Sequence, residues 1–369
     1  MDSLLVYLIP VFVLFMVAEY AYGLKIGKST YTFNDTAVNL TLGLMSSISQ
    51  FVTKFFQIGI YILAYDMVWG AYENPFWHTW IGVAAGVLIF DFFDYWLHRA
   101  EHESAALWAA HVVHHQSPQY NFSVALRQVT TEPLLGFLFY LPMAFIGIPP
   151  EQLLLTALLV LFYQFFLHTD HVPKLGWLEN VLNTPSNHRV HHAVNERYLD
   201  KNYGVVTMIW DRLFGTYQAE TEPCRYGTVK PFTSNNPIWA NAIEYVGIWR
   251  KATSSDGLWN KVRAVFSPPG WMPEGYVGAS AADATVSMGD KQELPRLVIV
   301  AQFLVVAVLA GVLLSQEESL GYPIGTGIVV AIFALCGCLG ALIDRKINAL
   351  AALAVNLFAL AVCAYLFQL

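Results

Sequence analysis

Long apolar segments constrain this chain more than any other feature of its sequence. A bilayer's hydrocarbon core is about 30 Å thick and takes a helix of roughly 20 apolar residues. The segments that we expect to cross it are residues 4–22, 55–69, 80–97, 297–314, 324–343 and 347–366. Because lipid offers no hydrogen-bond partners, such segments must be helical. The sequence therefore predicts an all-α, polytopic membrane protein.

Two further apolar segments have special features. Residues 133–148 and 151–167 are shorter and flank Gly147-Ile-Pro-Pro150, which predicts a tight helical hairpin.

Residues 37–54 contain Asn39, Gln50 and Lys54. We expect this stretch to face the helix bundle or the membrane interface, ahead of the span at 55–69.

The composition agrees with a membrane protein and excludes other classes. Apolar residues make up 56% of the 369 residues and charged residues only 13%, about half the fraction usual in soluble domains. The net charge of −7 argues against a nucleic-acid partner. The four cysteines are too scattered for a disulfide scaffold or a thiolate metal site.

Lysine and arginine indicate the orientation in the membrane. With the first span running inward, the outside loops are residues 70–79, 147–151 and 315–323, and none contains a Lys or Arg. Since basic residues stay on the cytoplasmic side, residues 98–132 and 168–293 are predicted to be cytoplasmic, with both termini outside. The membrane is a bacterial inner membrane or the endoplasmic reticulum.

Histidines are concentrated in one part of the chain. Ten of the 11 lie within residues 98–192, and only His78 stands apart. They form one HxxxH motif, two HxxHH motifs and a separate pair. In chain order the ten are His98, His102, His111, His114, His115, His168, His171, His188, His191 and His192.

The spacing indicates a metal centre rather than a histidine-rich surface. Residues four apart share a helix face, so HxxxH directs two imidazoles to one ion. HxxHH adds an adjacent ring that is aimed elsewhere, which suits a site for two metals. Imidazole binds iron, zinc and copper well. Two clusters lie where an expected span ends, so we expect a histidine-rich, two-metal helical cap at the cytoplasmic membrane face.

The surrounding sequence is similar to a known family. Four segments resemble the fatty acid hydroxylase and sterol desaturase superfamily of membrane di-iron oxygenases. They are Asp91-Phe-Phe-Asp-Tyr-Trp-Leu-His98, the box Asn183-Thr-Pro-Ser-Asn-His-Arg-Val-His-His192, Asp200-Lys-Asn-Tyr-Gly204 and Ile209-Trp-Asp-Arg-Leu-Phe-Gly-Thr216. Tyr120-Asn-Phe-Ser-Val-Ala-Leu-Arg-Gln128 and the three C-terminal spans resemble its alkylglycerol monooxygenase-like branch. The resemblance covers roughly residues 30–275.

The resemblance implies the ligands and the chemistry. The implied metal ligands are His98, His102, His111, His114, His115, His188, His191 and His192, with His168 as a ninth. The cofactors would be two iron ions and O2, with an external reductant. That reductant is tetrahydrobiopterin in the alkylglycerol monooxygenase-like branch, and a ferredoxin or cytochrome system elsewhere in the superfamily. The substrate would be a membrane lipid, hydroxylated next to the ether oxygen of an alkylglycerol.

Five neighbouring residues are candidates to orient the metal-binding rings. Asp91 and Asp94 share a helix face with the HxxxH pair, and acidic residues inside a span are costly and usually functional. Glu103 follows that motif directly, and Asp170 lies between the paired histidines. His171 has no counterpart in the family pattern, so ligation, an orienting role and a merely interfacial position all remain open.

The function and the domain organisation follow from these features. We expect an N-terminal span at 1–29, the oxygenase domain at 30–275, a linker at 276–293 and three C-terminal transmembrane helices at 294–369. The alternative within the superfamily is a sterol or fatty-acyl hydroxylase or desaturase that receives electrons from a partner protein. A metal transporter or sensor is the non-enzymatic alternative, although a transporter would carry its ligands near the bilayer midplane.

Overall fold

The described part of the chain is helical. The computed structural model describes residues 2–70, 72, 74–274, 296–316 and 319–366. Within these residues there are two isolated β-bridges, Leu182 with Thr207 and Ala193 with Tyr226, and no strand. This confirms the helical class expected from the sequence.

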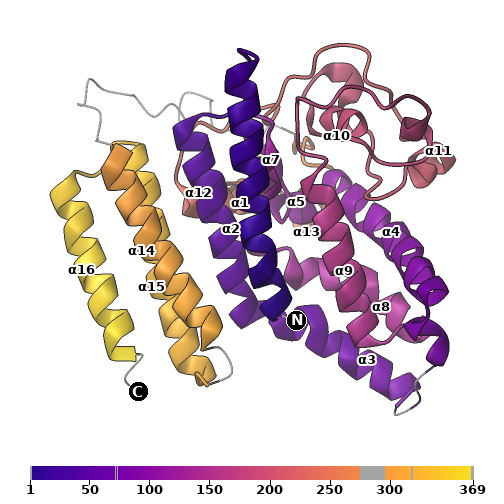
Figure 1. The fold of residues 1–369 in the computed structure, drawn as a ribbon, viewed down its shortest axis with the longest axis horizontal. Coiled ribbons are helices and arrows are strands. Elements are labelled where there is room, and N and C mark those ends of the chain that lie inside the picture. Colours follow the sequence, from indigo (N-terminus) through magenta and orange to yellow (C-terminus); the bar gives the residue numbers. More distant parts are fainter. Residues whose placement is uncertain (1, 71, 73, 275–295, 317–318, 367–369) are drawn as a thin grey trace.

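The helices that form the bundle run mostly side by side (Figure 1). In chain order they are α1 (Asp2–Lys25), α2 (Phe33–Lys54), α3 (Ile60–Val68), α4 (Trp80–Glu103), α8 (Pro133–Ile146), α9 (Pro150–Phe165), α14 (Arg296–Ser315), α15 (Tyr322–Ile343) and α16 (Ala349–Leu366). Five helical segments of the described chain are long and apolar enough to cross a membrane: Leu8–Lys25, Phe33–Val68, Trp80–Glu103, Arg296–Ser315 and Tyr322–Ile343. The protein is therefore a multi-pass membrane protein.

The second candidate crossing segment is longer than expected. Figure 1 shows α2 running the height of the bundle, whereas α3 lies across its lower end. A π-helical turn at Phe55–Gly59 joins the two helices, and such turns redirect a helix. Asn39 and Ser49 of α2 are buried in the bundle, whereas Gln50 and Lys54 are exposed. The candidate crossing segment is Phe33–Val68, so it includes the residues that we expected to cross and extends back through the helix before them.

The hairpin between α8 and α9 forms as expected. Gly147 ends α8 with φ +93°, a conformation that glycine adopts without strain. The amide of Ile148 then donates to the carbonyl of Met143 at 3.1 Å, which closes the turn. The Trp69 ring lies against this turn, 2.8 Å from where a Cβ on Gly147 would stand.

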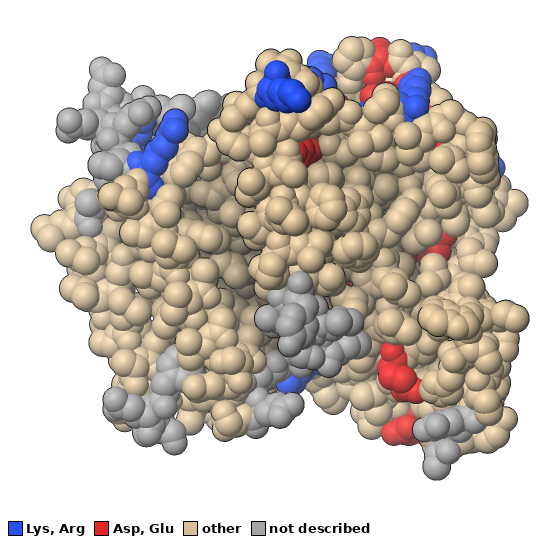
Figure 2. All heavy atoms as spheres, in the orientation of Figure 1, with Lys and Arg blue, Asp and Glu red and all other residues tan. Residues whose placement is uncertain are grey.

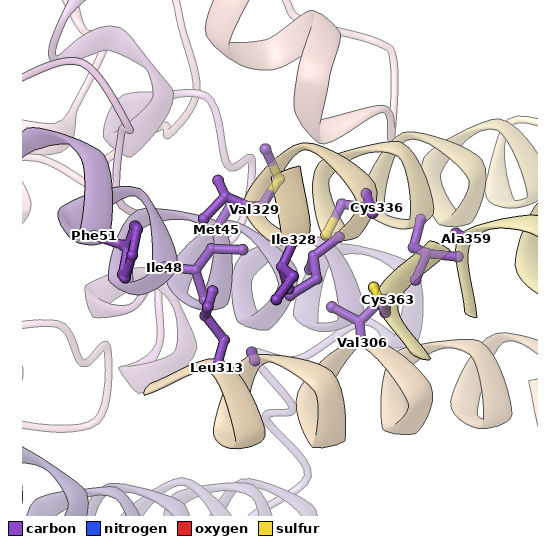
Figure 3. Close-up of a cluster of buried hydrophobic side chains, with 14 residues drawn as sticks. Met45, Ile48, Phe51, Val306, Leu313, Ile328, Val329, Cys336, Ala359 and Cys363 are labelled. Carbon is purple, nitrogen blue, oxygen red and sulfur yellow. The ribbon is translucent and has the colours of Figure 1, made fainter. Parts of the chain in front are cut away.

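The three C-terminal helices share a core with α2 (Figure 3). Met45, Ile48 and Phe51 of α2 pack with buried residues of α14, α15 and α16. Gly325 on α15 allows this close approach, because a Cβ there would lie 2.0 Å from the Phe51 ring. The predicted boundaries of the oxygenase domain and of the C-terminal helices remain predictions, and the predicted linker at 276–293 lies outside the described residues.

The helices between α4 and α8, and those between α9 and α14, build a cap on the bundle. They are α5 (Ala105–Ala109), α6 (Val112–His115), α7 (Phe122–Ala125), α10 (Pro185–His192), α11 (Ile209–Phe214), α12 (Pro237–Thr253) and α13 (Gly257–Phe266). Single turns of 3-10 helix occur at Pro75–His78, Gly176–Asn180 and Glu196–Tyr198. Figure 2 shows most of the visible Lys and Arg side chains gathered at the end of the molecule that carries α10 and α11, above a broad belt in which few charged side chains are visible. This distribution is the one that the positive-inside rule predicts.

Candidate metal centre

Nine buried or half-buried histidines form two adjacent groups where the cap meets the ends of α4 and α9. In each group one ring nitrogen per residue lies within 4.8 Å of all the others. We call them group one and group two. Group one consists of His98, His102, His111, His115 and His191, and group two of His114, His168, His188 and His192. The structure thus brings together all nine residues that the sequence singled out as ligands.

Each HxxHH motif divides its rings between the groups. In residues 111–115 the first and last rings join group one and His114 joins group two. In residues 188–192 the first and last rings join group two and His191 joins group one. This is the arrangement expected from helical spacing, and it places the two groups side by side.

Local sequence fixes the helix that carries the last motif. Thr184 precedes α10, and its hydroxyl accepts a hydrogen bond from the amide of Asn187 at 3.3 Å. Pro185 occupies the first turn, where its missing N–H costs nothing. This N-terminal hydrogen bond fixes where α10 begins, so that its three histidines fall on the side facing α6.

Ring nitrogens face one another at short distances within each group. In group two, Nε2 of His168 lies 3.1 Å from Nε2 of both His114 and His188. In group one, Nε2 of His115 lies 3.0 Å from that of His111 and 3.1 Å from that of His191. Metal–nitrogen bonds of about 2.1 Å at roughly right angles put two ligand nitrogens about 3 Å apart.

The opposite ring nitrogens show that the facing atoms carry lone pairs. Nδ1 of His114 lies 3.1 Å from the carbonyl of Arg127, and Nδ1 of His168 lies 2.9 Å from that of Gln164. Because a carbonyl only accepts, each Nδ1 carries the proton, and the neutral ring then has a bare Nε2. Two lone pairs 3.1 Å apart repel unless a cation lies between them. The residues therefore fit a metal ion.

Burial keeps the rings neutral, as metal ligands must be. It lowers the pKa of His111 to about 3 and that of His168 to about 4. Burial and the neighbouring rings lower the pKa of the other ligand candidates outside the spans in the same direction: His114, His115, His188, His191 and His192. At pH 7 these side chains are unprotonated and ready to bind metal.

A buried loop orients two rings of group one. Nδ1 of His98 faces the carbonyl of Tyr203 at 2.9 Å, and Nδ1 of His191 faces that of Lys201 at 3.2 Å. The carboxylate of Asp211 holds this loop by accepting from the amides of Tyr203 at 2.8 Å and Gly204 at 2.6 Å. The segment 200–216 therefore positions the metal-binding rings through its backbone.

The carboxylate of Asp91 forms hydrogen bonds with the same loop rather than with a histidine. Its carboxylate accepts from the amide of Val206 at 2.6 Å, the hydroxyl of Thr207 at 2.7 Å and the indole of Trp210 at 2.9 Å. The sequence placed Asp91 on the helix face of the HxxxH pair, which is correct. Its hydrogen bonds reach the histidines only indirectly, through the loop.

The other candidates for orienting roles have partners elsewhere. Asp94 accepts from the Tyr140 hydroxyl at 2.6 Å, and Glu103 pairs with Arg99 at 2.9 Å. Asp170 accepts from the Tyr226 hydroxyl at 2.7 Å. The hydrogen bonds and ion pairs found for these three carboxylates in the described chain connect none of them to a ligand candidate.

His171 and His78 lie outside both groups. The His171 ring packs edge-on against Tyr22, with ring centroids 5.4 Å apart, and touches Gly23 on α1. His78 lies in the 3-10 turn before α4. Neither residue is placed where it can bind with the nine.

Two carboxylates beside the centre were missed by the sequence analysis. Glu101, which is 4% exposed, lies 3.0 Å from Nδ1 of His111 and is the carboxylate that directly orients a ring. Its position inside the HxxxH box was the available signal. Glu19 on α1 accepts from the Thr169 hydroxyl at 2.5 Å and from the amide of Phe122 at 2.8 Å, which ties α1 to the loop behind His168. The available sequence signal for Glu19 was its position as an acidic residue within an apolar span.

Comparison with known proteins identifies the class. The model of the fatty acid hydroxylase family matches residues 83–216, which contain all nine histidines. The chain belongs to this family and is an oxidoreductase of the monooxygenase type.

Individual relatives show which members of the family this chain is similar to. An alkylglycerol monooxygenase from Danio rerio is 33% identical over 92% of this chain and 77% of its own length. One from Homo sapiens is 38% identical over 67% of this chain and 55% of its own length. An ornithine lipid hydroxylase from Rhizobium tropici is 27% identical over 52% of this chain and 59% of its own length. No solved structure matches the chain.

Proposed function

We propose that this protein is an integral-membrane di-iron oxygenase that uses O2 to hydroxylate an alkylglycerol lipid at the carbon next to the ether oxygen. The observation that carries the proposal is the pair of histidine groups, whose bare Nε2 atoms face one another about 3 Å apart. Bound iron would supply the redox chemistry that activates dioxygen, which zinc lacks. The 33% identity to an alkylglycerol monooxygenase over 92% of the chain supports the substrate class.

The residues of the chain have definable tasks in this reaction. His98, His102, His111, His115 and His191 would hold one ion, and His114, His168, His188 and His192 the other. The carboxylate of Glu101 and the carbonyls of Tyr203, Lys201, Arg127 and Gln164 keep the rings oriented. Such orienting contacts raise ligand basicity and fix the tautomer.

The overall reaction balances with an external reductant. The lipid gains one oxygen atom at a C–H bond, and the second oxygen atom leaves as water after taking up two electrons and two protons. The product is a hemiacetal, which breaks down to an aldehyde and a glycerol lipid. Tetrahydrobiopterin is the reductant that the proposal favours. The active centre would face the cytoplasm, which agrees with the basic end of the molecule in Figure 2.

Turnover by purified protein tests the proposal. Iron-loaded protein in detergent is supplied with an alkylglycerol, O2 and tetrahydrobiopterin, and the lipids are analysed by mass spectrometry. We expect an aldehyde and the free glycerol lipid, and no product from His191→Ala. Turnover of sterols or acyl lipids with a ferredoxin or cytochrome system, and not of alkylglycerols with pterin, would favour the alternative within the superfamily. Metal binding without any oxygen uptake would favour a transporter or sensor.

A further inference from the structure

Helices α12 and α13 turn apolar side chains away from the rest of the molecule. On α13, Leu258 and Trp259 are 78% and 71% exposed, whereas Ala264 on the opposite side of the helix is 1% exposed. Phe266 on α13 and Trp249 on α12 are also exposed. We call the surface formed by Trp249, Leu258, Trp259 and Phe266 the outer apolar face. An amphipathic helix in water buries its apolar side against the core, so this reversed arrangement calls for an apolar partner outside the protein.

The start of α12 lies beside a membrane-crossing segment. A Cβ on Gly340 of α15 would stand 2.4 Å from the Cα of Asn236, and one on Gly337 would stand 3.2 Å from the side chain of Ile238. Gly337 precedes the end of the crossing segment at Ile343 by six residues, which is about 9 Å along a helix. A helix that lies flat in a bilayer has its apolar side about 5–10 Å deep. The start of α12 is therefore at the depth expected of such a helix.

The other end of the helix pair lies where a second crossing segment ends. α12 and α13 pack on each other and on α5. The carbonyl of Ser267, directly after α13, accepts from the amide of Ala105 at 2.9 Å. Ala105 follows the crossing segment Trp80–Glu103 closely. Figure 1 shows both helices lower in the molecule than α10 and α11, beside the bundle. The pair therefore runs between two places where crossing segments end.

Basic side chains border the outer apolar face. With 3.6 residues per turn, Lys261 and Arg263 fall on opposite edges of the arc formed by Leu258, Trp259 and Phe266. Both basic residues are exposed, and α13 contains no acidic residue. Long basic side chains at such edges keep their charged ends among the headgroups while the apolar side enters the acyl chains. Their charge is complementary to that of an anionic phospholipid.

The helix α5 lies between this surface and the metal centre. The ring of Trp108 on α5 lies 5.0 Å from that of His102 and 5.6 Å from that of His115, centroid to centroid. Because α12 and α13 both pack on α5, their position bears on the wall of group one.

We propose that α12 and α13 lie flat in the bilayer leaflet on the side of the metal centre, with the outer apolar face among the acyl chains and with Lys261 and Arg263 on anionic headgroups. The inference goes beyond the proposed function, because it concerns how the cap is anchored and holds for any substrate. It places the α5 wall of group one at the depth where the lipid chains begin.

Quenching of a fluorescent label by lipids brominated on their acyl chains tests this position. In a Cys224→Ser background, Leu258→Cys carries an environment-sensitive thiol label, and the full-length protein is reconstituted into nanodiscs. We expect the brominated lipid to remove most of the emission. Glu196→Cys, at an exposed position near α10, is the control and should keep its emission. The melting temperature of each labelled protein is compared with that of the unlabelled protein, so that a loss of fold is recognised. Equally weak quenching at both positions would overturn the proposal.

A comparison of headgroups tests the basic edges. Brominated phosphatidylglycerol and brominated phosphatidylcholine, at equal mole fraction, are compared as quenchers of the label at position 258. We expect stronger quenching by phosphatidylglycerol. Lys261→Gln combined with Arg263→Gln should lower this preference by up to about 5-fold for each charge removed. Arg197→Gln, at an exposed position near α10, should keep it. Equal quenching by the two lipids in the protein with both basic residues would contradict the binding of anionic headgroups.

Discussion

At the residue scale, the metal centre is defined by what lies on the outer side of each ring. The nitrogen that faces away from the other rings meets a backbone carbonyl in His98, His114, His168 and His191. In His111 it meets the carboxylate of Glu101. These partners fix the tautomer that leaves Nε2 free for a metal.

The first prediction concerns Glu101. Glu101→Gln keeps the size of the side chain and replaces the carboxyl group that faces Nδ1 of His111 with an amide. We expect metal affinity to fall by about 10–100-fold, since orienting partners of ligand rings have effects of this size. Competition with a chelator measures it, and Glu196→Gln is the matched control. An unchanged affinity would show that Glu101 does not support the ring.

The second prediction separates ligands from other histidines. His102→Ala removes a ring of group one and should abolish turnover and lower the bound iron. His171→Ala lies outside both groups and should keep its iron, and His78→Ala should keep both iron and activity. Iron per chain and oxygen uptake are measured for each variant. Full activity in His102→Ala would contradict the assignment of group one.

The ligand residues were predictable from the sequence, whereas the groups that hydrogen-bond to their rings and orient them were mostly not. HxxxH and HxxHH fix which rings share a helix face, so the spacing was sufficient to find eight residues and to divide each HxxHH motif between two groups. His168 lies outside these motifs and was predicted from the family resemblance. The partners of Nδ1 are mostly backbone carbonyls from residues 127–203, and side-chain patterns carry no signal for them. Asp91 shows the same limit, because its helix face was predictable and its bonds to the loop at 206–210 were not.

At the element scale, α2 joins the C-terminal helices to the rest of the bundle. Its apolar face packs on α14, α15 and α16, while Asn39 near its start bonds to Ser123 and Arg127 beneath the cap. The sequence expected a crossing at residues 55–69 because these are the more apolar half. It did not show that the helix before them, whose Asn39 and Ser49 are buried, belongs to the same apolar segment, Phe33–Val68.

The third prediction tests this packing through one glycine. Gly325→Val would place side-chain atoms on the Phe51 ring, where a Cβ alone would stand 2.0 Å away. Overpacking of this kind should lower the free energy of unfolding by about 1–3 kcal/mol, measured by thermal unfolding in detergent. Gly311→Val on α14 is the control, because nothing lies within 4 Å of a Cβ there. Equal stabilities of the two variants would contradict tight docking of α15 on α2.

At the scale of the whole molecule, the charges and the metal centre share one end of the bundle. The cap holds the histidines, and the Lys and Arg side chains gather there, while the turns at Gly147 and before α4 lie at the other end (Figures 1 and 2). The sequence predicted this arrangement from the loops that lack Lys and Arg. It did not reveal how the segments 104–132 and 168–274 fold over the bundle, because contacts between residues far apart in the chain leave no local pattern.

The fourth prediction concerns orientation. In a Cys224→Ser background, Thr79→Cys should react with a membrane-impermeant thiol reagent on intact cells, and Asp256→Cys should react only after the cells are opened. Both positions are exposed, so accessibility to the reagent depends on the side of the membrane. Labelling of Asp256→Cys alone on intact cells would place the metal centre on the opposite face.

The fifth prediction concerns pH. The unfolded chain protonates its histidines near pH 6.5, whereas the buried rings of His111 and His168 stay neutral until about pH 3 and pH 4. Between these values the unfolded state binds more protons, so stability falls as the pH falls, by up to about 1.4 kcal/mol per pH unit for each ring. The melting temperature of the metal-free protein should therefore drop from pH 7 to pH 5. His168→Asn should show a shallower drop, and a flat profile in the wild type would contradict neutral burial.

Metal stoichiometry tests the central claim most directly. The protein is produced with iron supplied, purified in detergent, and its metals are counted per chain by mass spectrometry. Two histidine groups that each hold an ion predict two iron ions per chain, and substitution of a ring in either group should reduce that count. A count of one, or of none in protein that remains folded, would contradict the two-ion centre.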